Sequence, residues 1–320
     1  KKKFRETATM ALDPQVKALL DGMAAAAGPR IMDVPVKDGR EMYRGIAATL
    51  DLQGVPIGKV EDRTIEGPDG DIPLRIYTPV AAGSGALPVL VYFHGGGWVI
   101  GDLETHDALC RTLANEAGVM VVAVDYRLAP EHVFPAAVDD CYAAVKWVEA
   151  NGGPLGMDVT RIAVAGDSAG GNLAAVVSQI AKAEKGPRIT FQLLIYPVTD
   201  TNVDTGSYTA NASGYFLERD GMMWFFDHYL QGADRNDPRI APLKAASLAG
   251  LPKAYVITAG FDPLRDEGRA YAEAMKAAGV DTVHVNYDGM IHGFFNLQGA
   301  FDVARDAVKA AAKALKESLA

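Results

Sequence analysis

Apolar runs and helical patterns alternate along most of the chain. Runs rich in Val, Ile, Leu and aromatic residues predict strands at 58–66, 72–78, 88–94, 119–125, 161–166, 190–196, 253–259 and 282–287. Between them, apolar residues at helical spacing predict helices near 103–117, 136–150, 171–185, 264–279 and 298–318. The middle strands are continuously apolar, which is typical of strands buried on both faces. The pattern predicts an α/β fold, with a mostly parallel eight-stranded sheet covered by helices on both faces.

Two segments do not fit this alternation. Residues 11–50 have helical patterns before any strand, including an apolar stripe at Val16, Leu19, Leu20 and Met23. Residues 200–240 interrupt the sheet with apolar clusters at 213–217 and 222–226. We expect both segments to pack together as a helical cap over the carboxyl ends of the strands. The predicted organisation is an N-terminal leader with cap helices at 1–50, the sheet-bearing domain at 51–199 and 241–320, and a second cap segment at 200–240.

Composition narrows the class of protein. The 320 residues are 49% hydrophobic and 22% charged, which is typical of a globular domain with a large core. The net charge of −9 argues against nucleic acid and anionic membrane surfaces as partners, because both select a basic face. No run approaches the 18 apolar residues of a membrane span. Cys110 and Cys141 lack a C-x-x-C partner and are expected to be buried free thiols. We expect residues 1–9 to be a tag or disordered leader and the location to be cytoplasmic.

A serine framed by glycines lies between a predicted strand and a predicted helix. The motif GDSAG at 166–170 follows the apolar run 162–165 and precedes a helical pattern. A G-x-S-x-G in a strand–turn–helix context is the nucleophile elbow of α/β-hydrolases, and an HGGG-type loop supplies their oxyanion hole. HGGGW at 94–98 follows an earlier strand, so a glycine-rich turn with an idle Ser168 is the weaker interpretation. The first helical N–H after the serine, that of Ala169, is one expected oxyanion donor.

The order of the motifs restricts the search for a base and an acid to positions after Ser168. His292 is the candidate base, because it lies in the loop 288–294 after the last strand, between two glycines. Asp262 is the candidate acid, since it comes first after the strand 253–259. A loop histidine bound to backbone and a simple helix N-cap are the alternatives for these two residues. The other histidines precede the serine or lie in the cap or a strand: His94, His106, His132, His228 and His284.

Six motifs together resemble the hormone-sensitive-lipase family of carboxylesterases, also called bacterial family IV. They are HGGGW at 94–98, DYRLAPE at 125–131, FPAA at 134–137, GDSAGG at 166–171, DPLRDE at 262–267 and HGF at 292–294, and the resemblance covers residues 73–295. It implies a serine carboxylesterase of the α/β-hydrolase fold, with His94 shaping its loop. The aspartate before the serine indicates the GDSAG subgroup. Its catalytic triad would be Ser168, Asp262 and His292, and its oxyanion donors would come from Gly96, Gly97 and Ala169.

The expected substrate is a carboxylic ester with a short or medium acyl chain. We expect Trp98, Asp167, Tyr196, Met222 and Phe225 to contact it, although the cluster at 222–226 fits core packing equally well. No cofactor and no metal are expected, since dinucleotide, P-loop and zinc motifs are missing from the sequence. A homodimer is possible. The alternative function is a non-catalytic small-molecule receptor on the same fold, as in plant gibberellin receptors. The histidine at 292 argues against it, because receptors of that type lack the catalytic histidine.

Overall fold

A single sheet organises residues 11–320, the part of the chain that the computed structural model describes. Its strand order is β1-β2-β4-β3-β5-β6-β7-β8. Only β2 runs antiparallel to its neighbours, and the other pairings are parallel. The prediction of a mostly parallel eight-stranded α/β sheet is therefore confirmed. The strands are β1 (Lys59–Gly67), β2 (Gly70–Thr78), β3 (Leu87–Phe93), β4 (Met120–Val124), β5 (Met157–Asp167), β6 (Ile189–Ile195), β7 (Lys253–Phe261) and β8 (Thr282–Ile291).

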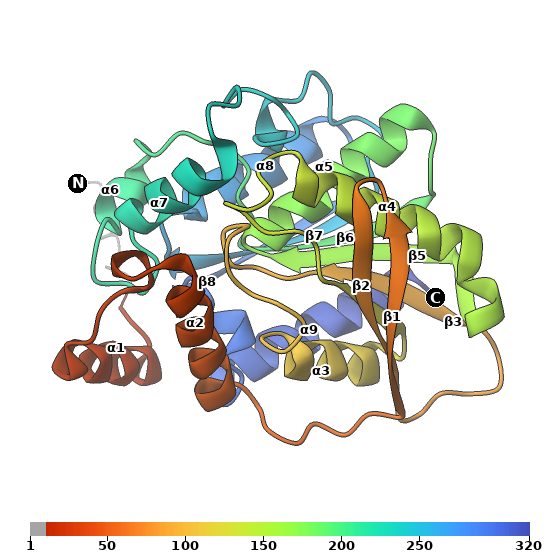
Figure 1. The fold of residues 1–320 in the computed structure, drawn as a ribbon, viewed down its shortest axis with the longest axis horizontal. Helices are drawn as coiled ribbons and strands as arrows, with labels where there is room; N and C mark the ends of the chain where they lie inside the picture. The colour runs from red at the N-terminus through yellow and green to blue at the C-terminus, as the bar shows by residue number, and fades with distance from the viewer. Residues whose placement is uncertain (1–10) are drawn as a thin grey trace, which may run out of the picture.

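Helices cover both faces of the sheet. Figure 1 shows α3 (Asp107–Ala117) and α9 (Asp302–Ser318) on one face, and α4 (Ala136–Asn151), α5 (Ala169–Glu184) and α8 (Arg265–Ala277) on the other. The central strand β3 illustrates why both are needed. Val91 and Phe93 belong to the core under α4 and α5, whereas Leu90 and Tyr92 belong to the core under α3 and α9. Because alternate side chains of a strand point to opposite faces, a continuously apolar strand requires cover on each side.

Among the element boundaries that differ from the prediction, two have a local cause. The helix expected from residue 103 begins at Asp107. Asp102 and Thr105 exchange hydrogen bonds between side chains and backbone, and this closed turn competes with the helix. The last strand continues through the expected loop as far as Ile291, which pairs with Phe261 after a register shift. His292 therefore follows directly from a strand, which leaves its backbone less freedom than a long loop would.

The two segments outside the sheet pattern contact each other. The N-terminal one contains α1 (Pro14–Ala26), η1 (Ile31–Asp33) and α2 (Val36–Leu50); the second contains α6 (Gly206–Ala210) and α7 (Arg219–Leu230), and all gather at one end of the molecule (left in Figure 1). Arg30 pairs with Glu218 at 3.1 Å. The Cε of Met32 lies 3.0 Å from the position of a Cβ on Gly221. Short 3₁₀ turns η2 (Gly153–Leu155), η3 (Pro242–Lys244) and η4 (Phe294–Asn296) complete the described chain.

The position of α1 corrects one expectation. Its apolar stripe packs against the α9 side of the sheet, on a core that Tyr215 and Phe216 of the second segment also contact. Val16 is fully buried in the core on the α9 side, and Leu19 and Leu20 pack against the same core. The backbone N–H of Asp13 donates to the carbonyl of Gly289 in β8. An amphipathic stripe shows that one face of a helix is buried, but it does not identify the surface on which that face packs. The contact with the second segment is made by η1, which follows α1. The expectation for residues 1–9 lies outside the described residues.

Candidate active site

Ser168 lies at a sharp turn between β5 and α5. Its φ of 56° and ψ of −119° are unusual for a residue with a side chain, and this strained turn lifts the Oγ out of the end of the sheet. The glycines at 166 and 170 make the turn possible. A Cβ on Gly170 would lie 1.9 Å from the carbonyl oxygen of Phe93, and one on Gly166 would lie 2.3 Å from the backbone of Gly170. The backbone N–H of Ser168 donates to Ile195 at 2.8 Å.

A histidine and a carboxylate continue from this serine in a chain of hydrogen bonds. His292 Nε2 lies 2.9 Å from Ser168 Oγ. On the other side of the ring, Nδ1 lies 2.8 Å from Asp262 Oδ2. Asp262 is fully buried, and its second oxygen accepts the backbone N–H of Leu264 at 2.8 Å. The carboxylate is therefore fixed in orientation and holds Nδ1 as the protonated nitrogen, which leaves Nε2 free to accept a proton from the serine.

Two aromatic side chains border the imidazole. The ring of Tyr196 lies 4.5 Å from that of His292, centre to centre, and Tyr196 is itself buried. The ring of Phe216, from the second cap segment, lies 3.1 Å from the position of a Cβ on Gly293. Glycine at 293 has a φ of 84°, so it serves both the turn and the close approach of the cap.

The glycine loop after β3 passes beside the serine. Gly96 and Gly97 both have positive φ, 120° and 59°. A Cβ on Gly96 would lie 2.1 Å from the carbonyl oxygen of Ile100, and one on Gly97 would lie 2.2 Å from the ring of Phe225. Only glycine fits at either position. The loop contacts the second cap segment through Phe225 at Gly97 and through Trp98, whose ring centre lies 6.0 Å from that of Phe226.

The other residues expected to contact substrate occupy different environments. Trp98 is fully buried and stacks on Tyr229 at 4.4 Å, and Met222 is 1% exposed in the same core. Asp167 is 2% exposed and enclosed by protein donors. A substrate atom could reach none of these three side chains without displacing the packing around them. Their burial argues against the prediction for Trp98, Asp167 and Met222, and for Phe225 and Tyr196 it stays a prediction.

His94, the first residue of the glycine loop, is held inside the protein. Its ring stacks on Tyr126 at 4.3 Å, and its Nδ1 lies 2.7 Å from the carbonyl oxygen of Gly95. The hydroxyl of Tyr126 donates to the carbonyl of His94 at 2.6 Å. Burial, reinforced by the neighbouring His106, lowers the pKa of His94 to about 4, so the ring is neutral at pH 7. These contacts shape the loop and leave the ring away from the serine.

Sequence reasoning missed the polar groups behind the glycine loop. Asp167 gathers hydrogen bonds from Tyr92, Gly95, His106 and Asn296. One local signal existed, because Asn296 follows the base by only four positions. His106 was set aside because it precedes the serine, a criterion that identifies a base but says nothing about a supporting residue.

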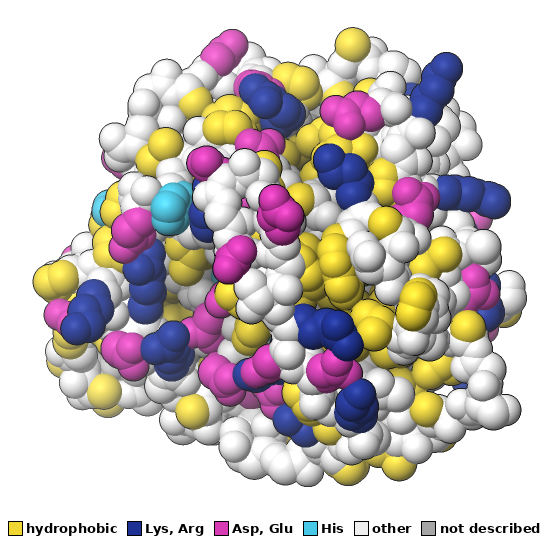
Figure 2. Space-filling view, turned by 45° about the vertical axis from the view of Figure 1, so that its right-hand side comes forward, with side chains coloured by type: hydrophobic (Ala, Val, Ile, Leu, Met, Phe, Trp, Pro, Cys, Tyr) yellow, Lys and Arg dark blue, Asp and Glu magenta, His cyan; other side chains and the backbone are white. Residues whose placement is uncertain are grey.

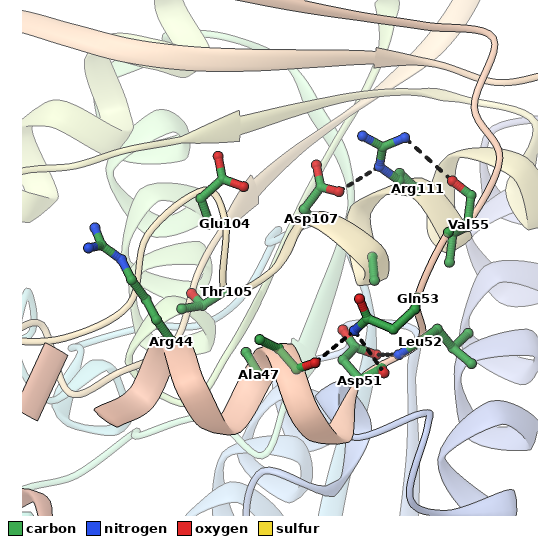
Figure 3. A pocket seen from close by; sticks show the side chains of 13 residues that line it. Arg44, Ala47, Asp51, Leu52, Gln53, Val55, Glu104, Thr105, Asp107 and Arg111 are labelled. Carbon is green, nitrogen blue, oxygen red and sulfur yellow. Dashed lines mark hydrogen bonds and ion pairs between the residues drawn. The ribbon is translucent and has the colours of Figure 1, made fainter. Parts of the chain in front are cut away.

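A polar cavity of about 450 Å³ lies away from the serine, between the end of α2 and the start of α3. Figure 3 shows Arg44 and Asp51 on one side of it, and Glu104, Asp107 and Arg111 on the other. Its charges are largely paired inside the protein, as in the 2.6 Å bond from Arg111 to Asp107.

Figure 2 shows a face on which charges of both signs are interspersed. Within residues 11–320 no cluster of three or more potential metal ligands occurs, and no helix is long and apolar enough to cross a membrane.

Comparison with known proteins identifies the family. A family model described as an alpha/beta hydrolase fold matches residues 90–296. The chain is 43% identical to carboxylesterase NlhH of Mycobacterium tuberculosis over 316 residues, covering 96% of each chain. It is 49% identical to carboxylic ester hydrolase LipN of the same organism over 302 residues, 89% of this chain and 77% of that protein.

Solved structures agree with this assignment. The structure of a thermostable esterase from Pseudomonas putida superposes with a TM-score of 0.94 at 40% identity, covering 98% of this chain and 99% of that one. The chain belongs to the α/β-hydrolase family of this model, and its resemblance to the carboxylesterases related to hormone-sensitive lipase is confirmed.

Proposed function

We propose that the protein is a serine carboxylesterase that hydrolyses short- to medium-chain carboxylic esters through an acyl-enzyme intermediate. The observation that carries this proposal is the chain of two hydrogen bonds from Ser168 through His292 to Asp262, 2.9 and 2.8 Å long, at a strained elbow. Relatives named as carboxylesterases at 43% and 49% identity support it. They also disfavour the receptor alternative, in which a catalytic base at position 292 would have no purpose.

The reaction follows the roles of the three side chains. Ser168 Oγ attacks the ester carbonyl carbon while His292 Nε2 takes the hydroxyl proton. The resulting imidazolium is stabilised by Asp262 through Nδ1–H, and it then returns its proton to the departing alcohol. Water attacks the acyl-enzyme in the same manner, with His292 again as base, and releases the carboxylic acid. No cofactor takes part in this scheme.

The negative charge on the carbonyl oxygen is met by backbone N–H groups. We assign them to Gly96, Gly97 and Ala169. Ala169 begins α5, and the first N–H groups of a helix lack partners within it. The glycines bring the loop backbone close to the serine, where a Cβ would not fit. Donors fixed in advance contribute most to acyl transfer, because they need no reorganisation as the charge develops.

The cap supplies the contacts to the acyl chain. We assign this role to η1, α2 and α7, together with two aromatic side chains of the second cap segment. The ring of Phe225 in α7 packs against Gly97, and the ring of Phe216 lies beside Gly293. Both rings present apolar surface next to the reacting groups, which suits an apolar acyl chain. The cap in this proposal is smaller than residues 1–50 and 200–240, because α1 docks on β8 instead.

A panel of p-nitrophenyl esters from acetate to palmitate tests the proposal. We expect kcat/KM to be highest for short or medium chains and low for palmitate. Ser168→Ala should lower kcat by about 10⁶-fold. Ser178→Ala is the matched control, since Ser178 is also buried and, within residues 11–320, its hydroxyl bonds only to the carbonyl of Ala174 in α5. Absence of ester hydrolysis, or a loss below about tenfold in Ser168→Ala, would overturn the assignment.

Two further features of the proposal concern setting and assembly. We propose a cytoplasmic location, supported by Cys110 and Cys141, which are buried free thiols of the kind found in reducing compartments. We also propose a homodimer through β8, an edge strand of the sheet that carries the 42% exposed Val283. Light scattering of the purified protein tests the dimer, and a monomeric mass at micromolar concentration would exclude it.

A further inference from the structure

Asp167 ties together three segments of the active site. It directly precedes Ser168, and its Oδ1 accepts the N–H of Gly95 in the glycine loop at 3.0 Å and the hydroxyl of Tyr92 at 2.7 Å. Its Oδ2 accepts the side-chain amide of Asn296 at 2.9 Å, four residues after His292. The nucleophile, the glycine loop and the segment that carries the base therefore meet at one buried carboxylate, which is separated from solvent.

His106 is the histidine partner of this carboxylate. Its Nε2 lies 3.1 Å from one oxygen of Asp167 and 3.3 Å from the other, and the ring is 1% exposed. Burial opposes ionisation of both groups, but their mutual attraction prevails. The pKa of His106 is raised, and the pKa of Asp167 is lowered to about 2. A buried charge without its partner is costly, so each holds the other in place.

The neighbours of His106 determine where its protons lie. The hydroxyl of Thr105 donates its single proton to the carbonyl of Asp102, at 2.9 Å. It can therefore only accept from His106 Nδ1, which lies 2.8 Å away. Nδ1 thus carries a hydrogen, and Nε2 faces both Asp167 and the side-chain nitrogen of Asn296, which lies 2.8 Å away. The other titratable or charged groups around the ring are Asp51 and Asp102, the rings of Tyr43 and His94, and Tyr92.

We propose that His106 is a positioning residue, which through Asp167 holds the glycine loop and the His292 segment in register with Ser168. This inference rests on the proposed ester hydrolysis, which it deepens. Because His106 touches neither the substrate nor the reacting atoms, its effect on the reaction passes through Gly95 and Asn296. A shift of the glycine loop moves the oxyanion donors of Gly96 and Gly97, and a shift of η4 moves the base.

A purely structural role would have a different effect. A buried ion pair that only stabilises the fold would, when broken, lower the melting temperature and leave kcat of the folded fraction unchanged. A positioning role lowers kcat with little change in KM, because the misplaced donors act on the transition state more than on the bound ester. A misplacement of about 1 Å can cost about 10²-fold in rate. The split between kcat and KM therefore separates the two roles.

The test compares His106→Leu with His106→Gln in the full-length protein. Glutamine can still donate a hydrogen bond to Asp167, whereas leucine leaves the carboxylate without this partner. We expect kcat for p-nitrophenyl butyrate to fall about 10- to 100-fold in His106→Leu with little change in KM, and to recover in part in His106→Gln. Gln192→Ala is the control, because Gln192 is buried in β6 and its side chain bonds, in the described part of the chain, to Pro252 and Met275, away from the serine. It should lower the melting temperature and keep kcat.

A second readout is independent of ester turnover. A fluorophosphonate reacts with an activated serine and is stabilised by the same oxyanion donors, so the rate of Ser168 modification is measured by mass spectrometry. We expect this rate to fall in parallel with kcat. If the wild-type protein is modified at Ser168 but hydrolyses no ester, the proposed function is refuted, and the positioning role can still be tested by the modification rate. Should His106→Leu not fold, Asn296→Ala breaks the same centre from η4, with the same expected result. Wild-type kcat and wild-type modification rate in folded variants would overturn the positioning role.

Discussion

The polar centre behind the glycine loop and the cap in front of it are held by different kinds of interaction. The centre consists of buried ionisable and polar groups, with Asp167 and His106 both at 2% exposure or less. The cap is joined across its two segments by Arg30 and Glu218, whose side chains are 51% and 21% exposed. Ion pairs in contact with water contribute little to stability, whereas buried ones resist displacement. The chemistry therefore rests on a fixed frame, and substrate selection rests on a part that can adjust.

The helix α2 belongs to both regions. Arg40 donates to the carbonyl oxygens of Val99 and Ala129, at 2.8 and 3.0 Å, and so joins α2 to the end of the glycine loop. Tyr43 lies next to His106, with ring centres 6.4 Å apart. A cap helix that is anchored in the catalytic frame can present a wall to the substrate without following every movement of α7.

Among the changes that test this comparison, the largest expected effect comes from breaking the centre with one methyl group. In Gly95→Ala the new Cβ would lie 2.2 Å from Asp167 Oδ2, so either the loop or the carboxylate must move. We expect kcat to fall about 10²- to 10³-fold, the loss that follows removal of one oxyanion donor. Steady-state kinetics on p-nitrophenyl butyrate measures this loss.

Gly45→Ala is the matched control for that change. A Cβ at position 45 of α2 has nothing within 4 Å, so only the helix propensity changes. This variant should keep kcat and gain roughly 0.5–1 kcal/mol in unfolding free energy. If Gly95→Ala is folded and as active as Gly45→Ala, the centre does not hold the loop rigidly and the comparison between the two regions fails.

A change in the cap should affect the preference for acyl-chain length more than the rate of the chemical step. Phe225 is half-buried, with its ring against Gly97. In Phe225→Ala we expect KM for the hexanoate ester to rise about tenfold while kcat for the acetate ester stays near wild type, because only the longer chain loses apolar contact. Met223→Ala, at a 44% exposed neighbour, is the control. An unchanged chain-length profile in Phe225→Ala would remove this ring from the acyl site.

The same division explains how much could be predicted from the sequence. Ser168, Asp262 and His292 are marked locally, since each follows the carboxyl end of a strand within a few residues of a glycine or proline. The frame behind them is not. His106 and Asp167 are 61 positions apart, and Asn296 and Asp167 are 129 apart. Contacts at such separations depend on strand order, which a periodic pattern does not encode.

The errors had physical causes as well. Trp98 and Met222 are large apolar residues that the sequence assigns to the substrate site, Trp98 within HGGGW and Met222 within the second cap segment. In the structure both belong to the core shared by α7 and the sheet. The stripe on α1 correctly indicated burial of Val16, but the partner surface is the α9 side of the sheet. Met23 of the same stripe is 43% exposed, so the pattern overstated burial there; for the buried residues, the sequence did not reveal the tertiary partner.

The smallest expected effect lies at the border between the regions, at Asp51 after α2. Asp51 lines the polar cavity in Figure 3 and is 7% exposed. Burial raises its pKa to about 6, so the folded state binds this proton more tightly than the unfolded state, in which the pKa is about 3.9. Stability is therefore lost as the pH rises from about 4 to 6, and Asp51→Asn removes this loss while its amide oxygen can still accept from Leu52.

We expect Asp51→Asn to raise the unfolding free energy by about 1–3 kcal/mol at pH 7 and to leave it nearly unchanged at pH 4, as measured by urea unfolding. Asp71→Asn, at an exposed carboxylate of β2, should change neither value. Because Asp51 makes no hydrogen bond to Asp167 or to the triad among the described residues, kcat should stay close to wild type. Equal stabilisation of Asp51→Asn at both pH values would show that the amide acts through packing, and a large loss of kcat would place Asp51 within the catalytic frame after all.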